Sequence, residues 1–162
     1  MEKVFGATER HDSIIGHGTK KAVLIFGYGE ENGMGYDYRH TFSHKPTLEE
    51  VLEVITDHVN ECVQTNILEG FVFEECKVWL TSENQLNYNN DFDTARETDG
   101  ASLPVIIKLE REGHDVFRQF DTIDELREFV LAMRSHITSC LADGWEEKKQ
   151  ARETFAKFFM SN

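Results

Sequence analysis

Two histidines, His40 and His44, are the first residues of this chain whose type and spacing suggest chemistry, because imidazole is a common zinc ligand. Their neighbours alternate as in a strand, however, and side chains four residues apart on a strand do not converge on one ion. The alternating Asn and Asp residues of 87–93 resemble the first ligands of a calcium loop, but the glycine at its sixth position and its closing glutamate are missing. We therefore predict no metal site.

The glycine-rich stretch 27–35 is the candidate for binding phosphate. A phosphate cradle needs a following helix and a Lys or Ser/Thr at a fixed offset, and this stretch has neither. It carries Glu30 and Glu31, which would repel phosphate. We interpret the stretch as the turn of a β-hairpin and predict no bound cofactor.

A catalytic arrangement of side chains is equally hard to find. The chain has no local signature such as G-x-S-x-G, and its adjacent acidic pairs would point apart on a helix or strand. His58 and His136 recur at equivalent places in two predicted helices, which favours a packing role. An enzyme stays open as a hypothesis only if a pocket gathers these two histidines with acidic side chains.

Composition limits the possible partners. The chain has 162 residues, 40% of them hydrophobic, which is enough to bury a core in one domain. Its net charge of -13 opposes phosphate backbones and anionic lipid, so we expect neither nucleic acid nor a membrane as partner. The three cysteines are widely separated within apolar pattern, which indicates buried thiols and a reducing compartment.

A nine-residue pattern occurs twice and predicts the beginnings of two helices. Thr47–Ile55 and Thr122–Val130 share an alternation of capping, apolar and acidic positions. In each copy the threonine is an N-cap and the glutamate three residues later, Glu50 or Glu125, completes a capping box. Each copy also follows a predicted hairpin, so the chain contains a weak internal duplication of a hairpin-then-helix unit.

The element order ββα-βα-ββα predicts an α+β fold, in which helices cover a mainly antiparallel sheet. Each long helix has one apolar stripe facing that sheet, centred on Leu52 in the first helix and on Phe129 in the last. The predicted elements are strands at 20–28 and 36–42, a helix from Thr47 ending before Gly70, a strand at Phe71–Leu80, a polar helix from Ser82 to Ala95, a hairpin of Leu103–Leu109 with Val116–Phe120, and a last helix from Thr122.

Both ends of the chain look different from its middle. Residues 1–19 are poor in apolar side chains and predict an extended N-terminal arm, whereas 20–145 form the domain. Gly144 should weaken or end the last helix, which leaves 146–162 as a helical extension. Its aromatic residues at helical spacing are Phe155, Phe158 and Phe159. They either fold back on their own domain or dock on another subunit.

Three stretches, Val78–Tyr88, Ala101–Val105 and Ala142–Lys149, resemble a family of small uncharacterised domains that phages and prophages encode, chiefly in gut Bacteroidota. The resemblance covers about residues 36–149, and Glu83–Tyr88 is its most specific part. The family occurs in tail-fibre or fibre-assembly contexts. It implies a role in the virion or its assembly and supplies no catalytic residues.

The most specific stretch also has a physical interpretation. Trp79 offers a large apolar anchor, and Asn84, Gln85 and Asn87 offer neutral donors and acceptors for the backbone of a partner. Alternatively, these amides only cap a helix and hold a turn. The predicted interface residues are Trp79, Asn84, Gln85, Asn87, Tyr88, Trp145, Phe155, Phe158 and Phe159.

These observations favour a non-enzymatic phage structural or assembly protein. It would be made in the bacterial host cytoplasm, reside in the virion, and dock to capsid, portal, tail or fibre subunits or to copies of itself as a homo-oligomer. The alternative is a phage-encoded cytoplasmic regulatory module that acts on a host protein, since the acidity of the chain would suit a basic partner.

Overall fold

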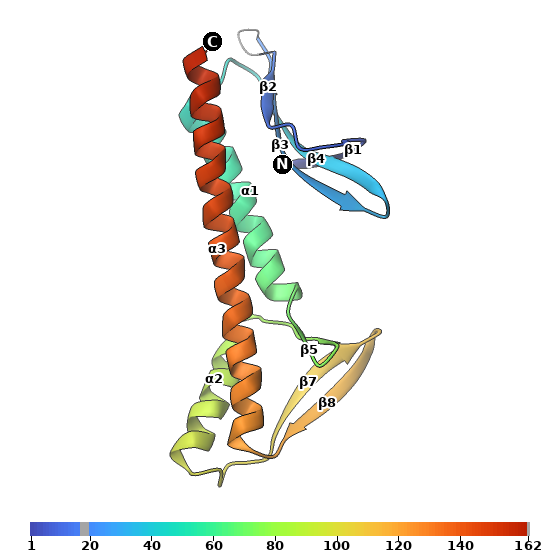
Figure 1. Ribbon diagram of the computed structural model, residues 1–162, viewed down its shortest axis with the longest axis vertical. Coiled ribbons are helices and arrows are strands. Elements are labelled where there is room, and N and C mark those ends of the chain that lie inside the picture. The colour runs from blue at the N-terminus through green and yellow to red at the C-terminus, as the bar shows by residue number, and fades with distance from the viewer. Residues whose placement is uncertain (17–19, 162) are drawn as a thin grey trace. The chain divides into compact units, whose positions relative to one another are not determined.

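The computed structural model describes residues 1–16 and 20–161 and confirms the predicted α+β class. In this part of the chain, three helices accompany two four-stranded antiparallel sheets (Figure 1). The chain forms two compact units, one of Met1–Glu61 with Gly144–Asn162 and one of Cys62–Asp143. The strands are therefore divided between two sheets, each with its own core. The boundary between the units falls inside the helices α1 (Leu48–Glu69) and α3 (Ile123–Ser161).

The sheet of the first unit has the order β1-β4-β3-β2. Its centre is the predicted first hairpin, with a tight turn at 32–33 where both residues have positive φ. The glycine-rich stretch also places Gly27 inside β3 at a register shift, where its φ is 70°. The strands are β1 (Glu2–Phe5), β2 (Ser13–Ile15), β3 (Ala22–Glu31) and β4 (Met34–Phe42).

The prediction of an extended N-terminal arm is wrong for the described residues of 1–19. β1 pairs with β4 and β2 pairs with β3, so this region supplies both edge strands of the first sheet. Residues 17–19 lie outside the described part of the chain. Strands this short need no long apolar run, because the central hairpin provides their hydrogen-bond partners and Ile14 alone is buried.

The prediction that Gly144 weakens or ends the last helix is also wrong. α3 continues through Gly144 and has 39 residues in all, and the described part of the predicted 146–162 extension is its C-terminal part. Glycine costs a helix about 1 kcal/mol relative to alanine. Burial of Ala151 and Phe155, which are 1% and 0% exposed, outweighs that cost.

The sheet of the second unit has the order β5-β6-β7-β8. The predicted strand Phe71–Leu80 is instead a short hairpin, because Glu74 and Glu75 form its turn with positive φ values of 48° and 64°. The core of this unit includes Phe120, Phe129 and Met133. The elements are β5 (Val72–Phe73), β6 (Cys76–Lys77), α2 (Ser82–Glu97), β7 (Val105–Arg111) and β8 (His114–Phe120), together with parts of α1 and α3.

Both predicted capping boxes are present. Thr47 Oγ1 accepts from the Glu50 N–H at 3.2 Å, and Glu50 Oε2 accepts from the Thr47 N–H at 2.7 Å. Thr122 and Glu125 make the same pair of bonds at 3.2 and 3.1 Å. The repeated pattern therefore marks the first turns of α1 and α3.

Replacement of Thr122 by alanine tests this assignment. We expect Thr122→Ala to lower the free energy of unfolding by about 1 kcal/mol, because the first turn of α3 loses a side-chain acceptor. Urea denaturation measures the change, and Thr122→Ser is the control because it keeps the hydroxyl. Equal losses in the two variants would show that the hydroxyl is not the stabilising group.

His58 is buried in the first unit, as its predicted packing role requires. Its ring lies 4.1 Å from the Tyr38 ring and 6.4 Å from the Phe26 ring, between centroids. Burial lowers the pKa of His58, and the chain's amino terminus acts in the same direction. Glu61 and Glu147 act in the opposite direction, but the net effect is still a lowered pKa of His58.

This lowered pKa predicts acid sensitivity of the first unit. The unfolded chain takes up a proton at its ordinary His pKa of about 6.5, whereas the folded state resists protonation. The stability contribution is therefore present above pH 6.5 and declines as the pH falls below it. We expect His58→Gln to flatten this decline in urea melts at pH 5 to 7.5, and the exposed His114→Gln to leave it unchanged. A parallel decline in all three proteins would contradict the assignment to His58.

Candidate functional site

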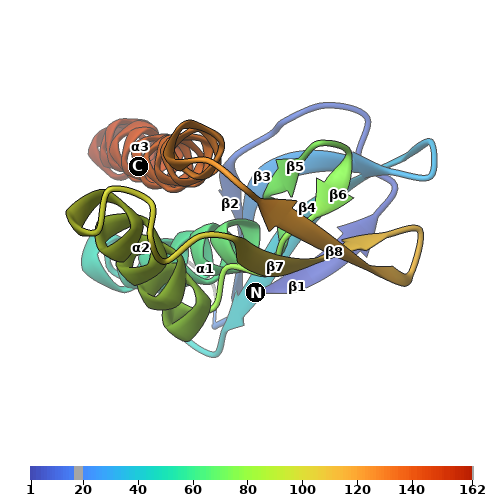
Figure 2. The same cartoon turned by 90° about the horizontal axis from the view of Figure 1, so that it is seen from below.

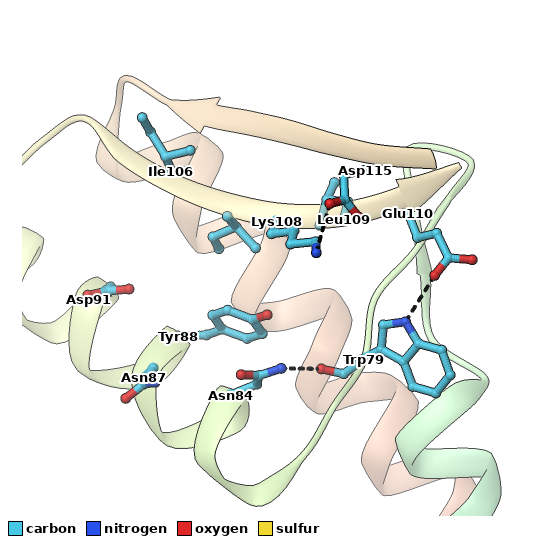
Figure 3. A pocket seen from close by; sticks show the side chains of 11 residues that line it. Trp79, Asn84, Asn87, Tyr88, Asp91, Ile106, Lys108, Leu109, Glu110 and Asp115 are labelled. Carbon is cyan, nitrogen blue, oxygen red and sulfur yellow. Dashed lines mark hydrogen bonds and ion pairs between the residues drawn. The ribbon is translucent and has the colours of Figure 1, made fainter. Parts of the chain in front are cut away.

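The second unit contains a groove of about 460 Å³, here called the α2–β7 groove, between a helix and a strand that lie side by side (Figures 2 and 3). One wall is α2, with Asn84, Asn87, Tyr88 and Asp91. The other wall is residues 106–110 of β7, and Trp79 stands at one end. Figure 3 shows Tyr88 in the space between α2 and β7, with Trp79 at one end.

The first turn of α2 fixes the end of the groove. Thr81 caps the helix by accepting from the Asn84 N–H at 3.1 Å. Asn84 Nδ2 donates to the Trp79 carbonyl at 2.8 Å, and Gln85 Nε2 donates to the Leu80 carbonyl at 2.7 Å. The amide donors of Asn84 and Gln85 therefore hold the turn, as the alternative interpretation expects, and their role toward a partner stays a prediction.

Contacts with Glu110 and Lys77 hold the Trp79 side chain in place, and part of it remains exposed to solvent. Its indole N–H donates to Glu110 Oε2 at 3.3 Å, and Lys77 Nζ lies 3.8 Å from the centre of a Trp79 ring. The residue is still 39% exposed. A held aromatic surface of this kind contributes binding energy at low entropic cost, since few rotamers are left to lose.

The hydroxyl of Tyr88 has no hydrogen-bond partner in the described part of the chain. The side chain is 9% exposed, and its ring packs against Phe129 at 5.2 Å between centroids. Burial and the nearby Asp91 raise the pKa of Tyr88, which keeps its proton on the oxygen near neutral pH. Among the described residues nothing accepts or donates a hydrogen bond at this hydroxyl, and Figure 3 shows it directed into the space between α2 and β7. A buried hydroxyl in this state has a hydrogen bond to gain from a ligand.

The charges around the groove are mainly negative. Lys108 Nζ is occupied by Asp115 at 2.9 Å, and Glu110 accepts from the indole. Asp91 is half-buried, and no described residue forms an ion pair or hydrogen bond with its carboxylate. Burial raises the pKa of Asp91 because water solvates its charge poorly there. A cationic group entering the groove would therefore find an unpaired acidic partner.

The remaining predicted interface residues belong to the first unit. Phe155 is 0% exposed, so its prediction as an interface residue is wrong, and it belongs to the core. Phe158 and Phe159 are half-buried, with ring centroids 5.9 Å apart, whereas Trp145 is 63% exposed. Helical spacing placed Phe155 on the apolar face of a helix. Spacing alone does not show whether that face packs within the chain or against a partner.

The β7 wall of the groove was not predicted. Ile106 is 60% exposed, and Phe117 on the neighbouring β8 is 67% exposed, although both are apolar. The apolar–polar alternation of Ile107, Lys108, Leu109 and Glu110 was a usable signal for placing Lys108 and Glu110 away from the core, but the apolar run Val105–Ile107 gave none for Ile106. Nothing local in the sequence indicates that this strand lies beside α2.

Within residues 1–16 and 20–161, no cluster of three or more His, Cys, Asp and Glu side chains could hold a metal ion. The helices in that part of the chain include none that is long and apolar enough to cross a membrane. Comparison with protein-family models, with curated proteins and with solved structures found no match.

Proposed function

We propose that this protein is a non-enzymatic docking module whose α2–β7 groove receives a segment of a partner protein. The observation that carries the proposal is the hydroxyl of Tyr88, a residue that is 9% exposed, because this hydroxyl has no partner in the described chain and Tyr88 lines a groove that ends at the half-exposed Trp79. Protein interfaces favour this combination of an aromatic anchor with a few buried polar groups.

The side chains in the groove support binding over catalysis. They include an indole, amides, a phenol, carboxylates and one amine, and the amine of Lys108 and the carboxylate of Glu110 are already engaged, by Asp115 and by the Trp79 indole. His58 and His136, which the enzyme hypothesis needs together, belong to different units. His136 Nε2 lies 3.0 Å from the Asn66 carbonyl, and its ring packs against Phe71.

The biological setting we propose is a phage virion or its assembly. It rests on the resemblance of Val78–Tyr88 to a phage-encoded family, and four residues of that stretch line the groove. In this setting the partner is a capsid, portal, tail or fibre subunit, or a second copy of the chain. Stoichiometric amounts of the protein in purified virions, measured by mass spectrometry, would support the setting, and its absence from them would contradict it.

Photo-cross-linking tests the docking function directly. We expect a photoreactive amino acid at Ile106 to capture one partner during infection, and Trp79→Ala to abolish that capture. Leu131 is the matched control position, because it lies in the same unit and is 56% exposed against 60% for Ile106. Equal capture from both positions, or none from Ile106, would overturn the proposal.

A host protein is the second candidate partner. The observation that favours it is the acidity of the chain and of the groove, with a net charge of -13 and the unpaired Asp91 carboxylate. The identity of the cross-linked protein distinguishes a host partner from a virion subunit.

A further inference from the structure

Strand β7 has a full strand partner along only one of its edges. β8 pairs with all seven residues of β7, whereas β6 pairs with it at one position, Lys77 opposite Glu110. Beyond Lys77 the chain continues its pairing with the preceding segment instead, as the Val78 N–H donates to the Phe71 carbonyl at 2.9 Å. The described structure therefore leaves the other edge of β7 open between Glu110 and the start of the strand.

The hairpin register shows which main-chain groups point to this open edge. A two-residue turn at 112–113, with φ values of 51° and 78°, closes on Arg111 and His114. Such a closing pair exchanges both hydrogen bonds, and every second residue then repeats the arrangement. The N–H and C=O groups of Lys108 and Ile106 consequently point away from β8. No backbone partner for them is found in the described residues.

The open edge and the groove occupy the same place. Residues 106–110 of β7 line the groove consecutively, as expected for a space along an edge, because side chains on one face would line it alternately. Asp115 of β8 also lines the groove, and its carboxylate is paired with Lys108. Tyr88 and Asp91 lie across from the edge on α2 (Figure 3). A strand added to β7 would thus carry alternate side chains toward the helical side of the sheet, where these two residues lie.

We propose that the partner segment binds as an additional β-strand on the open edge of β7, with a lysine or arginine side chain facing Asp91. This inference rests on the proposed docking function and states how the groove is filled. Main-chain bonds to Ile106 and Lys108 supply the affinity, and strand addition of this kind takes its specificity from alternate side chains. Asp91 selects a basic residue because its carboxylate is unpaired and half-buried.

Synthetic peptides test the inference on the full chain. The probes are a ten-residue peptide of alternating Lys and Val, its Glu and Val counterpart, and the Lys peptide N-methylated at alternate residues. Trp145→Phe leaves Trp79 as the only tryptophan, since the chain has two, so fluorescence then reports on the groove. Hydrogen exchange measured by NMR follows the amides of Ile106 and Lys108.

We expect the Lys peptide to change Trp79 fluorescence and to protect both amides from exchange. N-methylation should weaken binding about tenfold, because it removes main-chain donors. Asp91→Asn should weaken binding of the Lys peptide by about the same factor and reduce its salt dependence. The Glu peptide should bind more weakly than the Lys peptide.

One pair of variants separates the main chain from the side chain. Ile106→Pro removes the outward N–H and leaves the bonds to β8 in place, whereas Ile106→Ala removes most of the side chain and keeps the N–H. We expect the proline variant to bind about tenfold more weakly than the alanine variant, with similar melting temperatures for the two proteins.

Equal binding by these two variants, or unprotected amides at saturating peptide, would overturn strand addition. If the cross-link from Ile106 still forms, the docking function survives that result. Absence of the cross-link together with absence of peptide binding would overturn both. Preference for the Glu peptide would overturn the basic partner.

Discussion

Phe129→Ala is expected to destabilise the second unit by about 3 to 5 kcal/mol, a large part of the ~5 to 15 kcal/mol that stabilises a typical domain. Phe129 is 0% exposed, and its ring contacts four other aromatic rings at centroid distances of 5.1 to 5.9 Å. Truncation leaves a cavity that this rigid cluster cannot fill. Those four rings belong to Phe71, Phe73, Tyr88 and Phe120.

Urea denaturation of the full chain measures this loss. Leu131→Ala is the matched control, two residues further along α3, where the side chain is 56% exposed, and we expect it to change stability by less than about 0.5 kcal/mol. Similar losses for the two variants would show that Phe129 is not at the centre of the core.

Deletion of residues 151–162 is expected to unfold the first unit. The deletion removes Ala151 and Phe155, which are 1% and 0% exposed, and so opens the core formed by β3, α1 and α3. Phe155→Ala alone should cost about 3 to 5 kcal/mol. The sequence left open whether the aromatic residues of 146–162 fold back on their own domain or dock on another subunit, and the complete burial of Phe155 shows that this residue packs within the chain.

NMR resonances of residues in β3 and β4 report on the deletion, because they should lose their dispersion. Met160→Ala, at a position 87% exposed, is the control and should leave the spectrum folded. Retention of dispersed β3 and β4 resonances in the deletion variant would show that residues 151–162 are dispensable for the first unit.

Local signals predicted the helices and hairpins well. The capping boxes at Thr47 and Thr122 begin α1 and α3, and α1 ends at Glu69, just before Gly70 as predicted. These features depend on residues within one or two turns of each other. Leu52, predicted at the centre of a buried stripe, is only half-buried, while its neighbour Val51 is 0% exposed. An apolar stripe therefore predicts which face of a helix is buried more reliably than it predicts which residue on that face is buried most deeply.

Features that depend on distant partners were not predictable from the sequence. The strand Glu2–Phe5 exists because β4, more than 30 residues away, supplies its hydrogen bonds. The α2–β7 groove likewise needs Tyr88 and Ile106 side by side, and no periodicity encodes that pairing. The chemistry of Trp79, Asn84, Asn87 and Tyr88 singled them out in the sequence. The strand that faces them was also predicted, at Leu103–Leu109, but its position across from α2 was not.

The division of the chain into units also orders its folding during synthesis. The second unit is one continuous segment, Cys62–Asp143, whereas the first is made of two segments that flank it. As the chain leaves the ribosome, the second unit is complete when Asp143 has emerged. The first must wait for Phe155, near the C-terminal end of α3. We therefore expect the inner unit to fold first, contrary to the usual order in which N-terminal structure forms first, and the strands β1 to β4 to remain without their full core until Phe155 has emerged.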